Sequence, residues 1–135
     1  MSWTGIVEAC VAAVVMSNLT DWFFFGVLFH EQCNAFPEVW RLPAGSKDES
    51  KVVMRTAVVC TLTPLLFVLG CAYFNVTTAP PLAVAVLGIW AMTAVPHLFS
   101  NYLFMKLHPL MMAAHAMGWL ARFAVSALAV AILIK

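Results

Sequence analysis

Residues 110–134 read LMMAAHAMGWLARFAVSALAVAILI, and Arg122 is the only charged side chain among them. A helix needs about 20 apolar residues to cross the hydrocarbon core of a bilayer. This run is longer than that, and it lies between the Lys106-Leu107-His108-Pro109 break and Lys135. We therefore predict that it forms a transmembrane helix. The rest of the chain is then also interpreted as lying in or next to a lipid bilayer.

The whole chain has the composition of a membrane protein. Of its 135 residues, 64% are hydrophobic and 10% are charged, whereas about a quarter of the residues in an ordinary soluble domain are charged. The apolar runs exceed the length of a membrane β-strand and lack strict alternation, which excludes a barrel. The sequence predicts one all-α domain, residues 1–135. It is an integral membrane four-helix transmembrane bundle with helices over residues 3–29, 52–74, 81–104 and 110–134.

Cations are distributed unevenly over the predicted loops. Arg41, Lys47, Lys51 and Arg55 lie in or beside the first loop and Lys106 lies in the third, whereas the second loop carries none. Lys and Arg are enriched in the cytoplasmic loops of membrane proteins. We therefore expect the first and third loops to face the cytoplasm. Both termini would then lie on the non-cytoplasmic side of a bacterial cytoplasmic membrane.

The charge pattern also limits the partners. The formal net charge is +1 at pH 7, and the Lys and Arg residues are scattered. No basic patch is therefore present to bind a nucleic-acid backbone, and nucleic acid is excluded as a partner. The expected partners are membrane lipid, a small ligand or ion, and further copies of the chain, because two bundles together can enclose a path that one cannot.

The informative residues are the few polar side chains inside the predicted helices. A charge in the hydrocarbon costs about 2.5–3.5 kcal/mol on insertion scales, so it usually faces the bundle interior. At a rise of about 1.5 Å per residue, Asp21, His97 and His115 fall at similar depths in the cytoplasmic half. Asn18 precedes Asp21 by three residues and Asn101 follows His97 by four, so each pair shares a helix face.

A buried Asp21 needs a partner of opposite charge. Arg122 can supply it because its long side chain reaches along the helix, and a protonated His97 or His115 can supply it as well. His115 and Arg122 are seven residues apart and so lie on one face of the last helix. We predict a polar seam between the helices, formed by Asp21, His97 and His115 with Asn18, Asn101 and Arg122 in support.

Two interpretations of this seam compete. Polar groups between membrane helices can serve only to hold the helices together, contributing about 0.6–2 kcal/mol per interaction. The chain would then be a structural or accessory subunit. Alternatively, Asp and His exchange protons when their partner or solvent access changes, which makes the seam a ligand-binding or proton-exchange site. The chain would then be a membrane protein that binds a ligand or ion, with a small transporter as the specific case.

A metal centre is a further alternative. His30, His97, His108 and His115 all lie toward the predicted cytoplasmic side, and imidazole suits Zn or non-haem Fe. With such a metal the chain would be a membrane enzyme, for example an oxidoreductase. The spacing gives this alternative little support, because no HxxxH or ExxH pair occurs. No metal is therefore assigned, and the cofactor is left unknown.

Local features predict how the helices pack. Pro64 lies near the middle of the second helix, where its missing N–H typically bends a membrane helix. Ala114 and Gly118 let the last helix approach a neighbour closely. Trp3 and Trp40 are placed to anchor the chain at the membrane interface. We therefore expect a bent second helix and a closely packed last helix.

Two segments carry a resemblance to a known family. They are Asp21-Trp22-Phe23-Phe24-Phe25-Gly26-Val27-Leu28-Phe29, followed by Trp40 in the loop, and the segment from Lys106 to Ile134. In these segments the chain resembles a bacterial family of small four-helix membrane proteins catalogued only as a domain of unknown function. It departs from that family at His30-Glu31-Gln32, where many members have Gly and Lys. The resemblance implies a four-helix fold and implies no activity.

Overall fold

The computed structural model describes residues 2–31, 47–105 and 108–134. In this part of the chain, four helices are long and apolar enough to cross a membrane, namely Trp3–Leu28, Ser50–Tyr73, Ala79–Phe104 and Pro109–Leu133. The same residues contain no strand. The predicted all-α four-helix transmembrane bundle is therefore confirmed, and the helix bounds lie close to those expected from the apolar runs.

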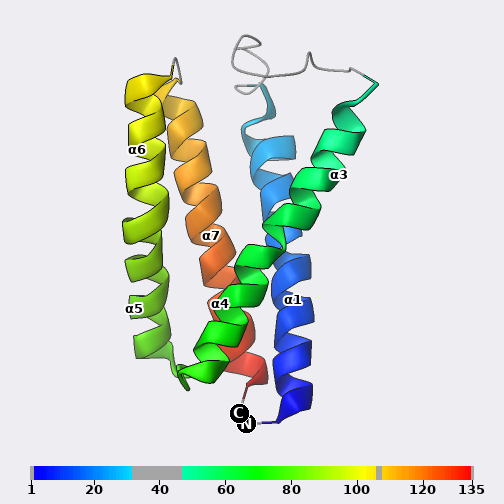
Figure 1. The fold of residues 1–135 in the computed structure, drawn as a ribbon, viewed down its shortest axis with the longest axis vertical. Helices are drawn as coiled ribbons and strands as arrows, with labels where there is room; N and C mark the ends of the chain where they lie inside the picture. Colours follow the sequence, from blue (N-terminus) through cyan, green and yellow to red (C-terminus); the bar gives the residue numbers. More distant parts are fainter. Residues whose placement is uncertain (1, 32–46, 106–107, 135) are drawn as a thin grey trace.

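Three of the four crossings are divided into shorter elements. The first consists of α1 (Trp3–Asp21) and the π-helix η1 (Trp22–Leu28), and the second of α3 (Glu49–Cys60) and α4 (Leu62–Tyr73). The third consists of α5 (Ala79–Ile89), the π-helix η3 (Trp90–Ala94) and α6 (Val95–Phe104). The fourth is α7 (Pro109–Leu133) alone. Figure 1 shows the start of α1 and the end of α7 at the same end of the bundle, as four crossings require.

Prolines explain two of these divisions. Pro64 has no N–H to donate to the carbonyl of Cys60, and the second crossing breaks at Thr61, just before the proline. Pro96 likewise cannot donate to the carbonyl of Met92, and η3 ends shortly before it. A wide π turn is one way in which a helix accommodates such a gap. The bend expected at Pro64 is present, and α3 leans away from the other helices in Figure 1.

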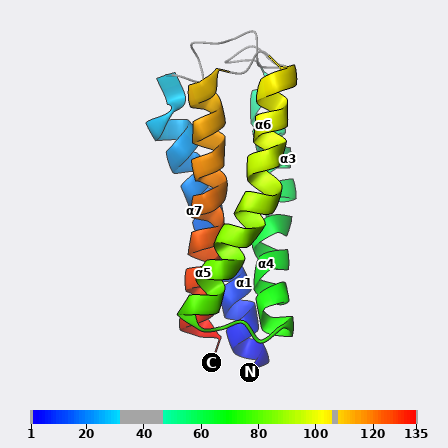
Figure 2. The same cartoon turned by 90° about the vertical axis from the view of Figure 1, so that its left-hand side faces the viewer.

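The centre of the bundle is the antiparallel pair of α1 and α7, which lie side by side in Figures 1 and 2. On α1 a small residue at every fourth position is buried: Gly5, Ala9, Ala13 and Ser17. On α7 a buried face has the same spacing and comprises Ala114, Gly118, Arg122, Ser126 and Val130. Small side chains let two helix backbones approach closely. Ala114 and Gly118 are both buried, as expected for a closely packed last helix, and a Cβ atom at Gly118 would lie 3.5 Å from the Phe25 ring of η1.

The other helices pack around this pair. α4 contacts both α1 and α7, whereas α5, η3 and α6 contact α7. Phe67 of α4 meets Phe123 of α7 with the ring centroids 5.6 Å apart. Trp90 of η3 donates a hydrogen bond from Nε1 to the carbonyl of Ala116 at 2.9 Å, which ties the wide turn to α7. Large apolar side chains on the outer faces are exposed, among them Trp3 at 82%, as a lipid surrounding allows.

The contact between α1 and α7 predicts how two glycines respond to substitution. A Cβ atom at Gly5 would lie 2.5 Å from the backbone oxygen of Leu133, whereas a Cβ at Gly70 would meet no neighbouring atom within 4 Å. Gly5→Ala should therefore lower the free energy of unfolding by about 1–3 kcal/mol. Gly70→Ala should leave it unchanged or raise it, because Ala favours a helix. The thermal unfolding midpoint in detergent micelles measures both, and equal midpoints would contradict the close contact.

Candidate functional site

An ion pair joins α1 to α7 inside the bundle. Arg122 donates from Nη2 to Oδ2 of Asp21. The Arg122 side chain is 7% exposed and the Asp21 side chain 24% exposed. The helices bring the two together because Asp21 follows Ser17 by one turn on the packed face of α1, and Arg122 follows Gly118 by one turn on α7. Of the partners expected for Asp21, the structure therefore selects Arg122.

The depth of this pair makes it unusual. At about 1.5 Å per residue, Arg122 lies near the midpoint of α7, a helix of 25 residues. A charge at this level is costly in lipid, so it faces the protein interior and takes a partner. Trp119 gives further support, because the guanidinium carbon of Arg122 lies 4.9 Å from the centroid of the indole ring. That distance is within the range of a cation–π interaction.

Much of the hydrogen-bonding capacity around this pair is unused. Among the described residues, Nε and Nη1 of Arg122, Oδ1 of Asp21 and Oγ of Ser17 are buried without a hydrogen-bond partner. Buried polar groups in proteins are nearly always paired. We refer to Ser17, Asp21 and Arg122 as the polar cluster. It presents two kinds of N–H donor, a carboxylate acceptor and a hydroxyl within about one helical turn, and these groups can bind a small molecule or ion.

Two other predicted residues lie on the same helices but take different contacts. His115 of α7 packs against Phe25 of η1, with the ring centroids 4.7 Å apart. Asn18 donates from Nδ2 to the carbonyl of Val14 at 2.9 Å. Both side chains are half-buried. Neither is bonded to the polar cluster within the part of the chain that the structure describes.

His97 lies apart from the polar cluster. It is an exposed residue of α6, and its Nε2 lies 3.3 Å from Nδ2 of Asn101. His97 and Asn101 therefore lie on one face of α6, as expected from their spacing. His97 borders a groove whose described lining comes from α4, α5, η3, α6 and α7, with no residue of α1. The structure therefore separates His97 from Asp21 and does not place both on one seam.

The histidines expected to form a metal centre do not gather. Within residues 2–31, 47–105 and 108–134, no group of three or more His, Cys, Asp or Glu side chains could hold a metal ion. His30 and His108 are exposed, His97 faces the groove, and His115 packs on Phe25. His108 is the N-cap of α7 and His115 lies within that helix, whereas His97 belongs to α6 and His30 lies beyond the end of η1. The geometry therefore gives no support to a metal-dependent enzyme.

The groove at His97 has a volume of about 500 Å³. Most of its lining is apolar, and aromatic side chains contribute a large part: Phe67 from α4, and Trp119 and Phe123 from α7. Trp119 therefore lines the groove and also contacts the guanidinium of Arg122. Among the described contacts, only those of the Trp119 side chain reach both the groove and the polar cluster.

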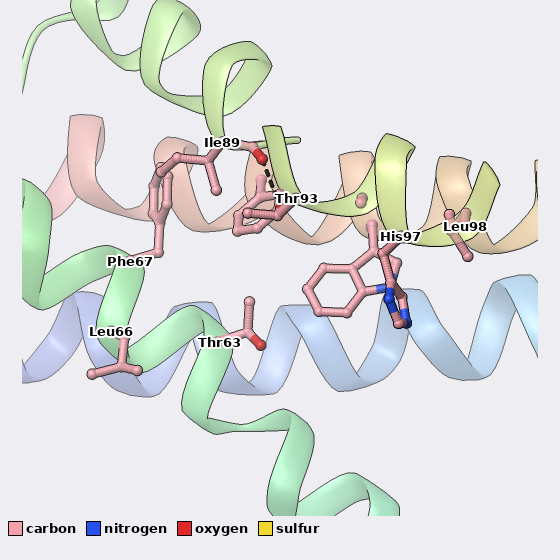
Figure 3. A pocket seen from close by; sticks show the side chains of 10 residues that line it. Thr63, Leu66, Phe67, Ile89, Thr93, His97 and Leu98 are labelled. Atoms are coloured by element: carbon pink, nitrogen blue, oxygen red, sulfur yellow. Dashed lines mark hydrogen bonds between the residues drawn. The ribbon is translucent and has the colours of Figure 1, made fainter. Parts of the chain in front are cut away.

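Three polar side chains complete the described lining of the groove. Figure 3 shows Thr93 and His97 on one side of it and Thr63 of α4 on the other. The Thr93 hydroxyl donates to the carbonyl of Ile89 at 2.6 Å, so its hydrogen is already used within the helix. No Asp, Glu, Lys or Arg belongs to this lining. The groove therefore suits an uncharged, largely apolar occupant.

Ser17 and Trp119 were not predicted as site residues. For Ser17 a signal exists, because small residues at every fourth position from Gly5 lead to Asp21. For Trp119 the signal is its position one turn before Arg122 on the same helix. The groove has no such signal, because it depends on the sideways separation of α4 from α6.

No protein-family model, curated protein or solved structure matches the chain. The resemblance to a family of small four-helix membrane proteins therefore stays a prediction. The polar cluster and the groove are the observations from which a function can be argued.

The ion pair predicts a specific pattern of stability. Asp21→Asn should destabilise the bundle by about 3–5 kcal/mol, because it leaves Arg122 as an unpaired buried charge. Adding Arg122→Gln removes that charge and should recover most of the loss. The unfolding midpoint in detergent, followed by circular dichroism, measures both variants.

The exposed pair of Asp48 and Lys51 offers a matched control. Its atoms lie 2.8 Å apart, and its side chains are 65% and 69% exposed. Asp48→Asn should change the midpoint little, because exposed pairs contribute little to stability. If the double variant at positions 21 and 122 were no more stable than Asp21→Asn, the account of a buried pair would be wrong.

Proposed function

We propose that the chain is a small membrane transporter that binds a proton and a small anion at the polar cluster. The observation that carries the proposal is the set of buried polar atoms without partners on Ser17, Asp21 and Arg122. A pair that only held two helices together would be expected to complete its hydrogen bonds, because unpaired groups in hydrocarbon are costly. The spare donors and acceptor are the groups that a ligand needs.

The charges of the cluster indicate which species bind together. Asp21 can accept a proton, and protonation would remove most of its attraction for Arg122. The guanidinium could then hold an anion through Nε and Nη1, the atoms that lack a partner among the described residues. The net charge of the site would stay zero throughout, because the bound anion replaces the negative charge that Asp21 loses on protonation. Binding of the proton would therefore favour binding of the anion, and the reverse would hold by linkage.

Two features of the first crossing support the exchange of a proton and an anion at Asp21. The Asp21 side chain is 24% exposed although Arg122 is nearly covered, so Asp21 is the charged residue of the cluster that lies nearer to the surface. The π-helix η1 begins at Trp22, directly after Asp21, and π turns occur frequently at functional sites. A wide turn beside the carboxylate would let the end of the crossing shift without breaking α1.

The proposal includes an orientation in a bacterial cytoplasmic membrane with both termini on the non-cytoplasmic side. The uneven distribution of Lys and Arg supports it. The polar cluster would then open toward the cytoplasm, because Asp21 lies in the half of the first crossing that is remote from Trp3.

Proteoliposomes loaded with the pH indicator pyranine test the transport proposal. An inward gradient of chloride, nitrate or phosphate should drive proton uptake by the wild-type protein above the rate of empty liposomes. Asp21→Asn/Arg122→Gln should abolish this uptake although the bundle stays folded. Asp48→Asn/Lys51→Gln, the matched exposed pair, should retain it.

Two results would count against the transporter. One is a wild-type rate equal to that of empty liposomes with every anion. The other is equal uptake by the wild type and by the double variant at positions 21 and 122, which would assign the pair to helix packing and favour an accessory role.

A further inference from the structure

The groove lined by α4, α5, η3, α6 and α7 forms a second candidate site, apart from the polar cluster. None of Ser17, Asp21 and Arg122 lines it. Its volume of about 500 Å³ lies within the range of about 300–1,000 Å³ that is typical of small-molecule sites. It is open between crossings whose outer side chains are apolar and exposed. A molecule dissolved in the bilayer could therefore enter it from the side.

The aromatic side chains of the groove form a platform. Phe67 and Phe123 have ring centroids 5.6 Å apart at an interplanar angle of 46°, and Trp119 and Phe123 have centroids 5.9 Å apart at 40°. All three rings contribute to the lining. Tilted aromatic pairs at these separations are favourable. Phe67 and Phe123 are buried, so the half-buried Trp119 offers most of the ring surface on which a planar ring can pack. The platform thus favours a flat apolar group.

His97 adds a hydrogen-bond donor to this apolar surface. Nε2 of His97 lies 3.3 Å from Nδ2 of Asn101, and in the tautomer in which Nε2 accepts from this amide the imidazole carries its proton on Nδ1. Among the described residues, this Nδ1 has no hydrogen-bond partner. An N–H group in hydrocarbon is costly unless it meets an acceptor. The occupant that suits the groove therefore offers an acceptor oxygen, and it carries no charge because the described lining holds no fixed one.

We propose that the groove binds a lipid-soluble molecule with a planar ring and a ring carbonyl, which is the chemistry of a quinone. The carbonyl accepts from Nδ1 of His97, the ring packs on Trp119 and Phe123, and an apolar tail extends into the lipid. The residues involved differ from the polar cluster, so this site and the transport function can each fail alone. Trp119 is the contact between them, because its indole also carries the guanidinium of Arg122.

Equilibrium dialysis with a radiolabelled decyl-substituted benzoquinone tests the proposal on the full chain in detergent micelles. Decylbenzene, which has the same tail and a ring without carbonyls, should compete poorly. His97→Ala should weaken quinone binding about tenfold, the effect of one hydrogen bond of about 1.4 kcal/mol. His97→Gln should recover part of the affinity, because its amide can donate. His97 is exposed, so these variants leave the packing of the bundle unchanged.

A matched pair of substitutions on α4 tests the position of the ligand. Leu66 lines the groove and Leu62 does not, and both are exposed, at 65% and 55%. Leu66→Trp should fill the groove and abolish quinone binding, whereas Leu62→Trp should leave it unchanged. Asp21→Asn/Arg122→Gln should still bind the quinone, which separates this site from the transport function.

Three outcomes would overturn the quinone site. Competition by decylbenzene as strong as that by the unlabelled quinone would indicate simple partition into an apolar surface. Equal affinities of the wild type and His97→Ala would remove the carbonyl contact. Equal affinities of Leu66→Trp and Leu62→Trp would place the ligand outside the groove.

Discussion

The ion pair between Asp21 and Arg122 constrains the whole bundle. Each charge needs the other, because the hydrocarbon offers neither water nor a counter-ion. Their contact fixes the register of α1 against α7, and the small residues from Gly5 to Ser17 and from Ala114 to Gly118 let the two backbones come close enough to make it. α4 then packs on both members of this pair, and the third crossing packs on α7.

The same ion pair has hydrogen-bonding groups that no described residue uses. Arg122 has donors and Asp21 an acceptor that no described residue satisfies, and this is the observation on which the proposed binding role rests. The groove on the other side of Trp119 is different in character, with an aromatic platform and the single imidazole of His97. Four helices therefore provide two candidate sites of opposite chemistry, a charged one at the polar cluster and an apolar one at the groove.

The sequence was sufficient for the helices but only partly for the site. Apolar runs predict crossings because length and composition alone determine whether a segment can span a bilayer, and Pro64 predicts a bend because it lacks an N–H. The charge and the long side chain of Arg122 predicted that it could meet Asp21. Depth along a helix placed Asp21, His97 and His115 at a similar level. It could not separate His97 from Asp21, because depth is one coordinate and the sideways order of helices depends on packing. The π turn after Asp21 gave no recognised signal.

The most direct test of this account is a distance measured in a lipid bilayer. Solid-state NMR of the full chain, with ¹³C in the Asp21 carboxyl group and ¹⁵N in the Arg122 guanidinium, reports the dipolar coupling between the two groups. The account predicts a coupling that corresponds to direct contact, with nitrogen and carboxylate oxygen within about 4 Å. No measurable coupling, or a coupling of the Arg122 nitrogens to lipid phosphate instead, would contradict it.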